Sequence, residues 1–164
     1  MSSEDAIVTR IRDAGSLLAA REYLLDAVLP LDWLTHDETQ SLFEAILLLP
    51  DKRLSRYKKL GLLFWRRTTP FRRWKLLFHA VRSVEYRFEP GSMRTGDFSI
   101  GDITYDWDRS LSIVTHEGLA IRVGMNRLQG ELIRCAEIDP QRILRTIVVG
   151  FFRPPGEVNI SGFK

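Results

Sequence analysis

The chain has 164 residues, 45% of them hydrophobic, which is enough for one domain with a core and too few for two. A charged fraction of 27% and aromatic residues along the whole chain exclude extensive disorder, and no apolar run approaches the roughly 20 residues that span a membrane. The net charge of +3 hides an uneven distribution of charge along the sequence.

The N-terminal residues carry a short apolar pattern at helical spacing. Ile7, Ile11 and Leu18 follow acidic residues that suit a helix start and not a signal peptide, so we expect the protein on the cytoplasmic side. The pattern predicts an N-terminal arm with a short amphipathic helix over residues 1–22, ahead of a globular domain over residues 23–164. Isolated helices below about 12 to 15 residues are marginal in water. We therefore expect the three apolar residues to mediate self-association, the alternative being packing on the chain's own core.

Two further helices are predicted after a region near residues 23–31 that favours a strand. Thr35 and Glu38 form a capping box ahead of an apolar stripe, which predicts a helix over residues 36–49 ended by Pro50. A second apolar stripe predicts another helix over residues 54–64, with basic residues on a separate face.

The apolar period changes to two beyond residue 80. Val84, Tyr86 and Phe88 alternate with charged residues, as in a half-buried strand. Further strands are predicted over residues 98–107, 111–115, 119–123 and 128–138, then a short helix over 139–145 and a closing hairpin over 147–152 and 157–160. The expected fold is a single α+β domain, in which N-terminal helices pack on a mostly antiparallel, twisted β-sheet.

A basic segment stands between residues 51 and 75, with ten basic residues against the single acid Asp51. Such asymmetry favours a polyanionic partner, either phospholipid headgroups or a nucleic-acid backbone, although a solvated helix face is the alternative. The candidate binding residues are Lys52, Arg53, Arg56, Lys58, Lys59, Arg66, Arg67, Arg72, Arg73 and Lys75. Aromatic rings within the segment are candidate hydrophobic contacts: Trp65, Phe71 and Trp74.

No residue pattern supports catalysis or metal binding. The three histidines are far apart, and Cys135 is the only cysteine, expected to be a buried small hydrophobe. The only carboxylate cluster comprises Asp102, Asp106 and Asp108, which are typical of a solvated turn. We expect no catalytic residue, no metal, no cofactor and no small-molecule substrate, and predict that the protein is not an enzyme.

Several short stretches, in the same order along the chain, resemble matrix proteins of rhabdoviruses. Residues 118–124 (GLAIRVG) are followed by LQGELIRC over residues 128–135, and this pair is similar to the GLxIRVG and IQG stretches of the lyssavirus branch. Residues 102–106 resemble the strand before that stretch, and the final ISGFK is similar to the vesiculovirus C-terminus. The likeness runs from about residue 23 to residue 164. The longer basic arm and the PPxY motif of the family have no counterpart here.

The resemblance implies a non-enzymatic viral structural protein that self-associates, binds the inner face of the membrane and condenses the nucleocapsid for budding. Its expected partners are copies of itself, an anionic membrane surface, the viral nucleoprotein and RNA. Its expected locations are the virion beneath the envelope, the host cytoplasm and the cytoplasmic face of host membranes. The rival hypothesis is a nucleic-acid-binding accessory protein, in which Arg66, Arg67, Arg72 and Arg73 contact phosphates and Phe71 or Trp74 stacks on bases.

Overall fold

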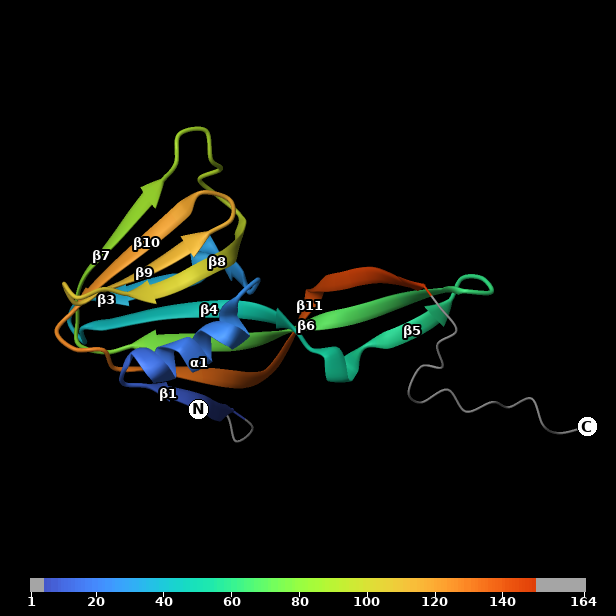
Figure 1. Cartoon of the computed structure of the whole chain (residues 1–164), viewed down its shortest axis with the longest axis horizontal. Helices are drawn as coiled ribbons and strands as arrows, with labels where there is room; N and C mark the ends of the chain where they lie inside the picture. Colours follow the sequence, from blue (N-terminus) through green and yellow to red (C-terminus); the bar gives the residue numbers. More distant parts are fainter. Residues whose placement is uncertain (1–4, 150–164) are drawn as a thin grey trace, which may run out of the picture. The chain divides into compact units, whose positions relative to one another are not determined.

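The computed structural model describes residues 5–149, and most of them lie in β-strands (Figure 1). Strand accounts for 63% and helical structure for 12%, and there is one α-helix within the described residues. The predicted α+β fold with N-terminal helices packed on a sheet is therefore wrong. A single large, mostly antiparallel sheet takes its place.

The sheet is built from strands that are mostly joined by short connections. Its strands are β1 (Ala6–Ile11), β2 (Val28–Pro30), β3 (Leu34–Asp37), β4 (Leu42–Pro50), β5 (Arg56–Lys59), β6 (Phe64–Phe78), β7 (Val81–Phe88), β8 (Asp97–Tyr105), β9 (Ser110–Thr115), β10 (Leu119–Met125) and β11 (Gly130–Val149). They are ordered β1-β11-β6-β4-β2-β8-β9-β10-β7, while β3 pairs with β4 and β5 with β6. The helical elements are α1 (Ala14–Leu24) and two 3-10 turns, η1 (Leu31–Trp33) and η2 (Lys52–Leu54).

The chain divides into two compact units. The first unit comprises Met1–Leu49 and Arg72–Asp139, and the second comprises Pro50–Phe71 and Pro140–Lys164. The expected border falls inside α1. Strands β4, β6 and β11 each carry residues of both units, and each has a proline within two residues of the border: Pro50, Pro70 and Pro140.

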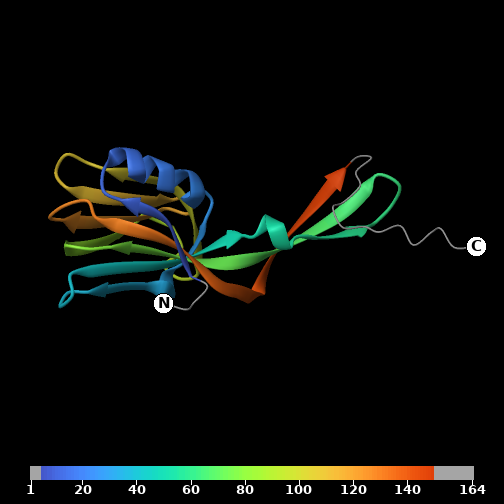
Figure 2. The ribbon, with the colours of Figure 1, turned by 90° about the horizontal axis from the view of Figure 1, so that it is seen from below.

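The core of the first unit follows from the two-residue repeat of its strands. Phe43, Phe78 and Phe98 are fully buried, and β9 and β10 bury alternate residues. Helix α1 lies beside β1 and β8 (Figure 2) and buries Leu17, Ala20 and Leu24. Burial of a large apolar side chain stabilises a fold by about 1.5 to 3 kcal/mol, so these layers hold the unit together.

The N-terminal segment is a strand followed by a helix. Ile7 and Ile11 lie in β1, which pairs with β11, and Leu18 lies on α1. Helix α1 begins later than expected because Asp13 is its N-cap, accepting a hydrogen bond from the backbone N–H of Ser16. Ile11 is fully buried in the first unit, while Ile7 and Leu18 are exposed. The helical seam predicted from these three residues is therefore wrong.

The helix predicted over residues 36–49 is also wrong, because β3 and β4 form an antiparallel hairpin there. Instead of capping a helix, the segment turns between the strands: Asp37 accepts a hydrogen bond from the backbone N–H of Gln40, and Ser41 has a positive φ of 51°. Residues 45–49 are apolar at every position, so they satisfy a helical period and a strand period equally. The structure buries Phe43, Ala45 and Leu47, which are two residues apart.

The helices predicted over residues 54–64 and 139–145 are also wrong. The first segment contains η2, β5 and the start of β6, and the second lies within β11, which continues through Pro140. The predicted strands over residues 84–88, 98–107, 111–115, 119–123 and 128–138 are confirmed as β7 to β11, with the hairpin between β9 and β10. The expected closing hairpin lies mostly outside the described residues. Cys135, in β11, is half-buried, and this burial raises the pKa of its thiol.

Gly130 begins β11 at a point of close approach between strands. It lies opposite Ile11 of β1, and a Cβ atom at this position would come 2.5 Å from the backbone oxygen of Leu77 and 2.6 Å from the ring of Phe78. Backbone cannot move aside as a flexible side chain can. Only glycine therefore fits without displacing β6.

We predict that Gly130→Ala lowers the free energy of unfolding by about 1 to 3 kcal/mol, the usual cost of overpacking a core. Chemical denaturation measures this change. Gly61→Ala is the matched control, because a Cβ at Gly61 would meet only the Phe64 ring at 3.7 Å. Equal losses in the two variants would contradict the close approach at Gly130.

Candidate anion-binding hairpin

Most of the basic segment forms a β-hairpin in the second unit. Strands β5 and β6 are antiparallel, with Arg56 opposite Thr68, Tyr57 opposite Arg67, Lys58 opposite Arg66 and Lys59 opposite Trp65. Residues 60–63 form the connecting loop, which the backbone N–H of Leu60 closes by donating to the carbonyl oxygen of Phe64 at 2.9 Å. The hairpin therefore presents two faces, each made of alternate residues.

One face of the hairpin packs inward. Trp65, Thr69 and Phe71 are buried, and the Thr69 hydroxyl lies 2.7 Å from that of Ser55. On the same face, Arg67 Nε donates a hydrogen bond of 3.2 Å to the hydroxyl of Thr146 in β11. The alternate residues lie on the opposite face of the hairpin, here called the outward face.

The outward face concentrates positive charge. It carries Arg56, Lys58 and Arg66, and none of them forms an ion pair with any acidic residue that the structure describes. Lys58 lies directly opposite Arg66, and like charges in that relation destabilise a β-ladder. An anion bound between them would remove the repulsion.

The tip of the hairpin is apolar and exposed. The exposed fractions are 50% for Leu60, 78% for Leu62 and 50% for Phe64. Basic residues flank this tip on both strands, with Lys58 and Lys59 before it and Arg66 after it. Apolar residues uncovered together and bordered by charge mark an interaction surface.

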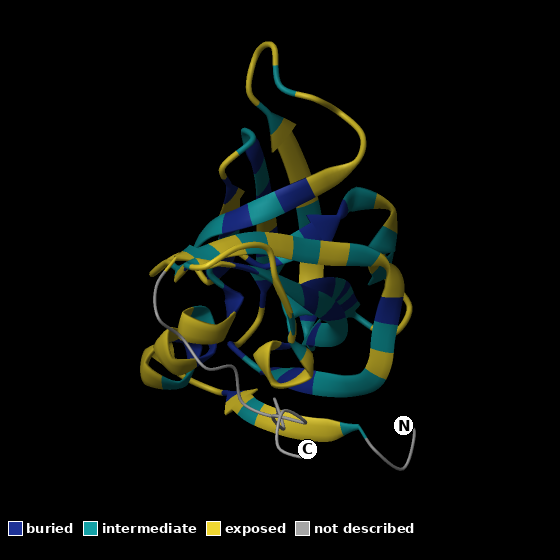
Figure 3. Cartoon of the chain, turned by 90° about the vertical axis from the view of Figure 1, so that its right-hand side faces the viewer, coloured by how far each residue is buried: buried dark blue, intermediate teal, exposed yellow. Residues whose placement is uncertain are grey.

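Strand β11 adds a second row to the outward face. Its residues in the second unit alternate between exposed and half-buried, as the banding of the strands in Figure 3 illustrates. Thr146 contacts Arg67 on the inward face, so the neighbouring odd-numbered positions face outward. Those include Ile143 at 45% exposed, Ile147 at 57% and the basic Arg145.

Three of the expected binding residues lie in the first unit and have internal partners. Arg72 donates hydrogen bonds to the carbonyl oxygens of residues 135 and 136. Arg73 pairs with Glu137 at 2.6 Å and stacks on the Trp33 ring, with 4.8 Å between the guanidinium carbon and the ring centroid. Lys75 pairs with Glu44 at 3.4 Å. The candidate site therefore reduces to the seven basic residues of the second unit: Lys52, Arg53, Arg56, Lys58, Lys59, Arg66 and Arg67.

The aromatic residues expected as hydrophobic contacts are occupied with packing. Trp65 is 6% exposed and lies under the Lys59 ammonium group at 5.7 Å, and Phe71 is 9% exposed. Trp74 packs against the core and stacks on Tyr23 with ring centroids 6.1 Å apart. Sequence reasoning missed Leu60, Leu62 and Phe64, although the run KKLGLLFWRR, with a glycine among apolar residues between two basic pairs, suggests an exposed turn.

The two units differ in charge. The described residues of the second unit include nine basic residues and one acid, whereas the first unit holds thirteen basic and nineteen acidic residues. The basic surplus of the whole chain therefore belongs to the second unit, and the first is acidic. An anionic partner is attracted to one unit only.

Two of the clustered carboxylates, Asp102 and Asp108, have arginine partners. Asp102 pairs with Arg21 at 2.7 Å, and Asp108 pairs with Arg122. Hydrogen bonds lower the pKa of both carboxyl groups. The largest effect on Asp102 comes from the Arg21 guanidinium, and the largest effect on Asp108 comes from the Ser110 hydroxyl. No group of three or more His, Cys, Asp or Glu side chains among residues 5–149 is arranged to hold a metal ion. Within the same residues, α1 is too short and too polar to cross a membrane.

No family model, curated protein or solved structure matches this chain. The resemblance to rhabdovirus matrix proteins therefore stays a prediction from short sequence stretches.

We predict that Lys58→Glu stabilises the hairpin at low ionic strength, because it replaces a repulsive cross-strand pair with an attractive one. The expected gain is about 0.2 to 1 kcal/mol, and it shrinks as salt screens the pair. Hydrogen exchange of the β5 and β6 amides measures it. Lys58→Gln, which removes the repulsion without creating attraction, should fall between the two. Faster exchange in Lys58→Glu would contradict the pairing.

Proposed function

We propose that this protein binds anionic membrane surfaces through the β5–β6 hairpin, as a peripheral membrane protein. The observation that carries the proposal is that one hairpin joins an exposed apolar tip with cations that form no ion pair with the acidic residues of the described part of the chain. Leu62 and Phe64 enter the boundary between headgroups and acyl chains, while Lys58 and Arg66 contact lipid phosphates and carboxylates.

The free energies of membrane binding favour the basic residues and the apolar tip acting together. Each basic residue near an anionic surface contributes about 1 kcal/mol, and each large apolar side chain that leaves water contributes about 1.5 to 3 kcal/mol. A single weak membrane signal gives reversible binding only, whereas two combined signals give stable attachment. The exposed tip and the cations beside it supply both signals within the same hairpin.

Nucleic acid is the rival partner for the same cations. A basic β-ribbon can enter a nucleic-acid groove. The stacking contacts expected of Phe71 and Trp74 are disfavoured, however, because Phe71 is buried and Trp74 stacks on Tyr23. An exposed leucine such as Leu62 contributes nothing to phosphate binding. The apolar tip therefore favours the lipid surface.

The wider matrix role is a proposal that the sequence resemblance alone supports. It adds nucleoprotein binding, self-association and a location beneath a viral envelope to membrane attachment. The α+β fold that the sequence patterns predicted is not the fold of this chain. The hairpin proposal does not depend on the resemblance, since it follows from exposure and charge.

We expect the wild-type protein to float with vesicles of phosphatidylcholine and phosphatidylserine, and not with phosphatidylcholine alone. Leu62→Ser with Phe64→Ser should reduce the bound fraction at all salt concentrations, because apolar burial is insensitive to screening. Reversal of Arg56, Lys58 and Arg66 to glutamate should abolish the dependence on phosphatidylserine.

The matched control reverses three exposed basic residues of the first unit, Arg12, Arg94 and Arg127, and should float as the wild type does. Failure of the wild type to float at low salt would overturn the proposal. An RNA titration at the same salt concentration tests the nucleic-acid hypothesis. The site would be assigned to nucleic acid if the wild type bound RNA without floating, if reversal of Arg56, Lys58 and Arg66 abolished RNA binding, and if the Leu62 and Phe64 variant kept it.

A further inference from the structure

Strand β7 is an outer strand of the sheet that residues 5–149 form. Among the described strands only β10 pairs with it. The backbone N–H of Glu89 donates to the carbonyl oxygen of Gly118, the residue just before β10. The odd-numbered residues of β7 therefore direct their backbone hydrogen bonds toward β10. Because these directions alternate along a strand, the N–H and C=O groups of Val84, Tyr86 and Phe88 point away from β10.

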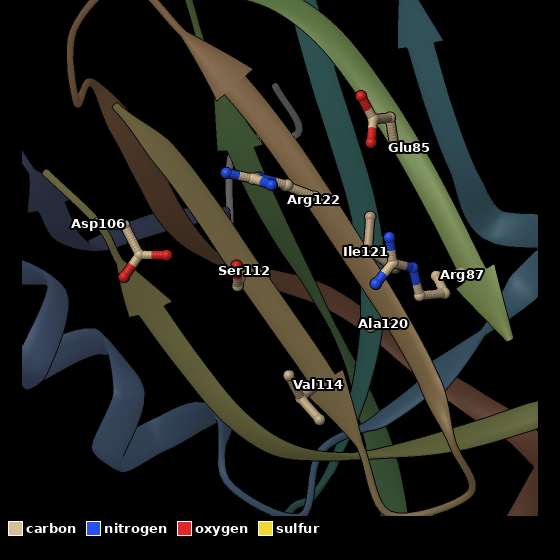
Figure 4. A pocket seen from close by; sticks show the side chains of 8 residues that line it. All are labelled: Glu85, Arg87, Asp106, Ser112, Val114, Ala120, Ile121 and Arg122. Carbon is tan, nitrogen blue, oxygen red and sulfur yellow. The ribbon is translucent and has the colours of Figure 1, made fainter. Parts of the chain in front are cut away.

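The side chains of β7 also divide between two faces. Val84 and Phe88 pack against the core, whereas Glu85 and Arg87 project from the opposite face beside Arg122 (Figure 4). They border a shallow hollow of about 280 Å³. Arg122 is paired with Asp108, and neither Glu85 nor Arg87 forms an ion pair with a described residue. Two opposite charges therefore lie two residues apart at the edge of the sheet, without an ion-pair partner among the residues that the structure describes.

This strand is complementary to itself in one antiparallel register. With Tyr86 opposite Tyr86 of a second copy, Glu85 lies opposite Arg87 of that copy, and the same pair repeats through the twofold axis. Glu85 and Arg87 then occupy positions that are not hydrogen-bonded, where facing side chains approach most closely. Val84 lies opposite Phe88 of the second copy, which extends the apolar face.

The neighbouring register is unfavourable. A shift that centres the pairing on Glu85 places this carboxylate opposite itself, and like charges directly opposite are destabilising. Unpaired edges are commonly protected from association by charge, and here the order of the charges permits one pairing and opposes another. Pro90, which has no N–H, follows the strand and limits the length of the ladder.

We propose that two copies of this protein associate through β7, forming a continuous antiparallel sheet with Tyr86 on the twofold axis. Val84, Tyr86 and Phe88 of each copy supply the backbone hydrogen bonds, and two Glu85–Arg87 pairs set the register. Tyr86, which is 43% exposed, becomes covered by its counterpart. This interface lies in the first unit and is separate from the lipid-binding hairpin.

Charge reversal tests this interface by sedimentation equilibrium without lipid. We expect a wild-type dimer, and a dissociation constant raised at least about tenfold by either Glu85→Arg or Arg87→Glu, since each places like charges at both pairs. The double variant should recover the dimer, because its pairs are reversed and still attractive. Arg82→Glu, which reverses a charge opposite Pro90 in this register, is the control and should leave the dimer unchanged.

The decisive measurement is sedimentation of the two single variants after they are mixed. Glu85→Arg and Arg87→Glu proteins, each monomeric alone, should form a heterodimer when combined, because one contributes two arginines and the other two glutamates to the interface. This result also shows that both variants are folded. A wild-type monomer up to the solubility limit, or single variants that dimerise as the wild type does, would overturn the proposal. Since no lipid is present, failure here leaves the flotation result standing.

Discussion

The alternation of side chains along β6 decides which of its residues reach solvent. In the first unit the alternation sends Leu76 and Phe78 into the core. In the second unit the same repeat turns Trp65 and Phe71 inward and leaves Arg66 on the other face. Beside that face, Leu62 and Phe64 at the tip of the hairpin remain exposed. One geometric rule therefore produces both the core and the candidate binding surface.

The division of charge between the units favours the second unit as the place where an anionic partner binds. An anionic surface attracts the basic hairpin and repels the acidic first unit. In the proposed membrane attachment, the second unit therefore supplies the electrostatic attraction, and salt weakens it. The edge strand β7 belongs to the acidic first unit.

The strands between residues 81 and 138 were predictable, because polar or charged residues alternate with apolar ones there. The strands before residue 80, and the part of β11 beyond residue 138, were not. Residues 45–49 are uniformly apolar, and β6 interleaves Arg66, Arg67 and Thr68 with buried rings, so local periodicity does not distinguish strand from helix. The basic composition of the site was evident from the sequence. The restriction of the site to the second unit was not evident, because the partners of Arg73 and Lys75 lie in strands that are far from them in the sequence.

The prolines at the border of the two units carry a consequence for how the protein opens. Pro50, Pro70 and Pro140 have no backbone N–H to donate, while the carbonyl oxygen of Pro70 accepts a hydrogen bond from the N–H of Asp51. Each of the three strands therefore has one backbone donor fewer near the border of the units. Among its described residues, the second unit buries Trp65 and Phe71 as large apolar side chains, far fewer than the first unit. We therefore expect this part of the chain to open at a lower free energy than the core of the first unit.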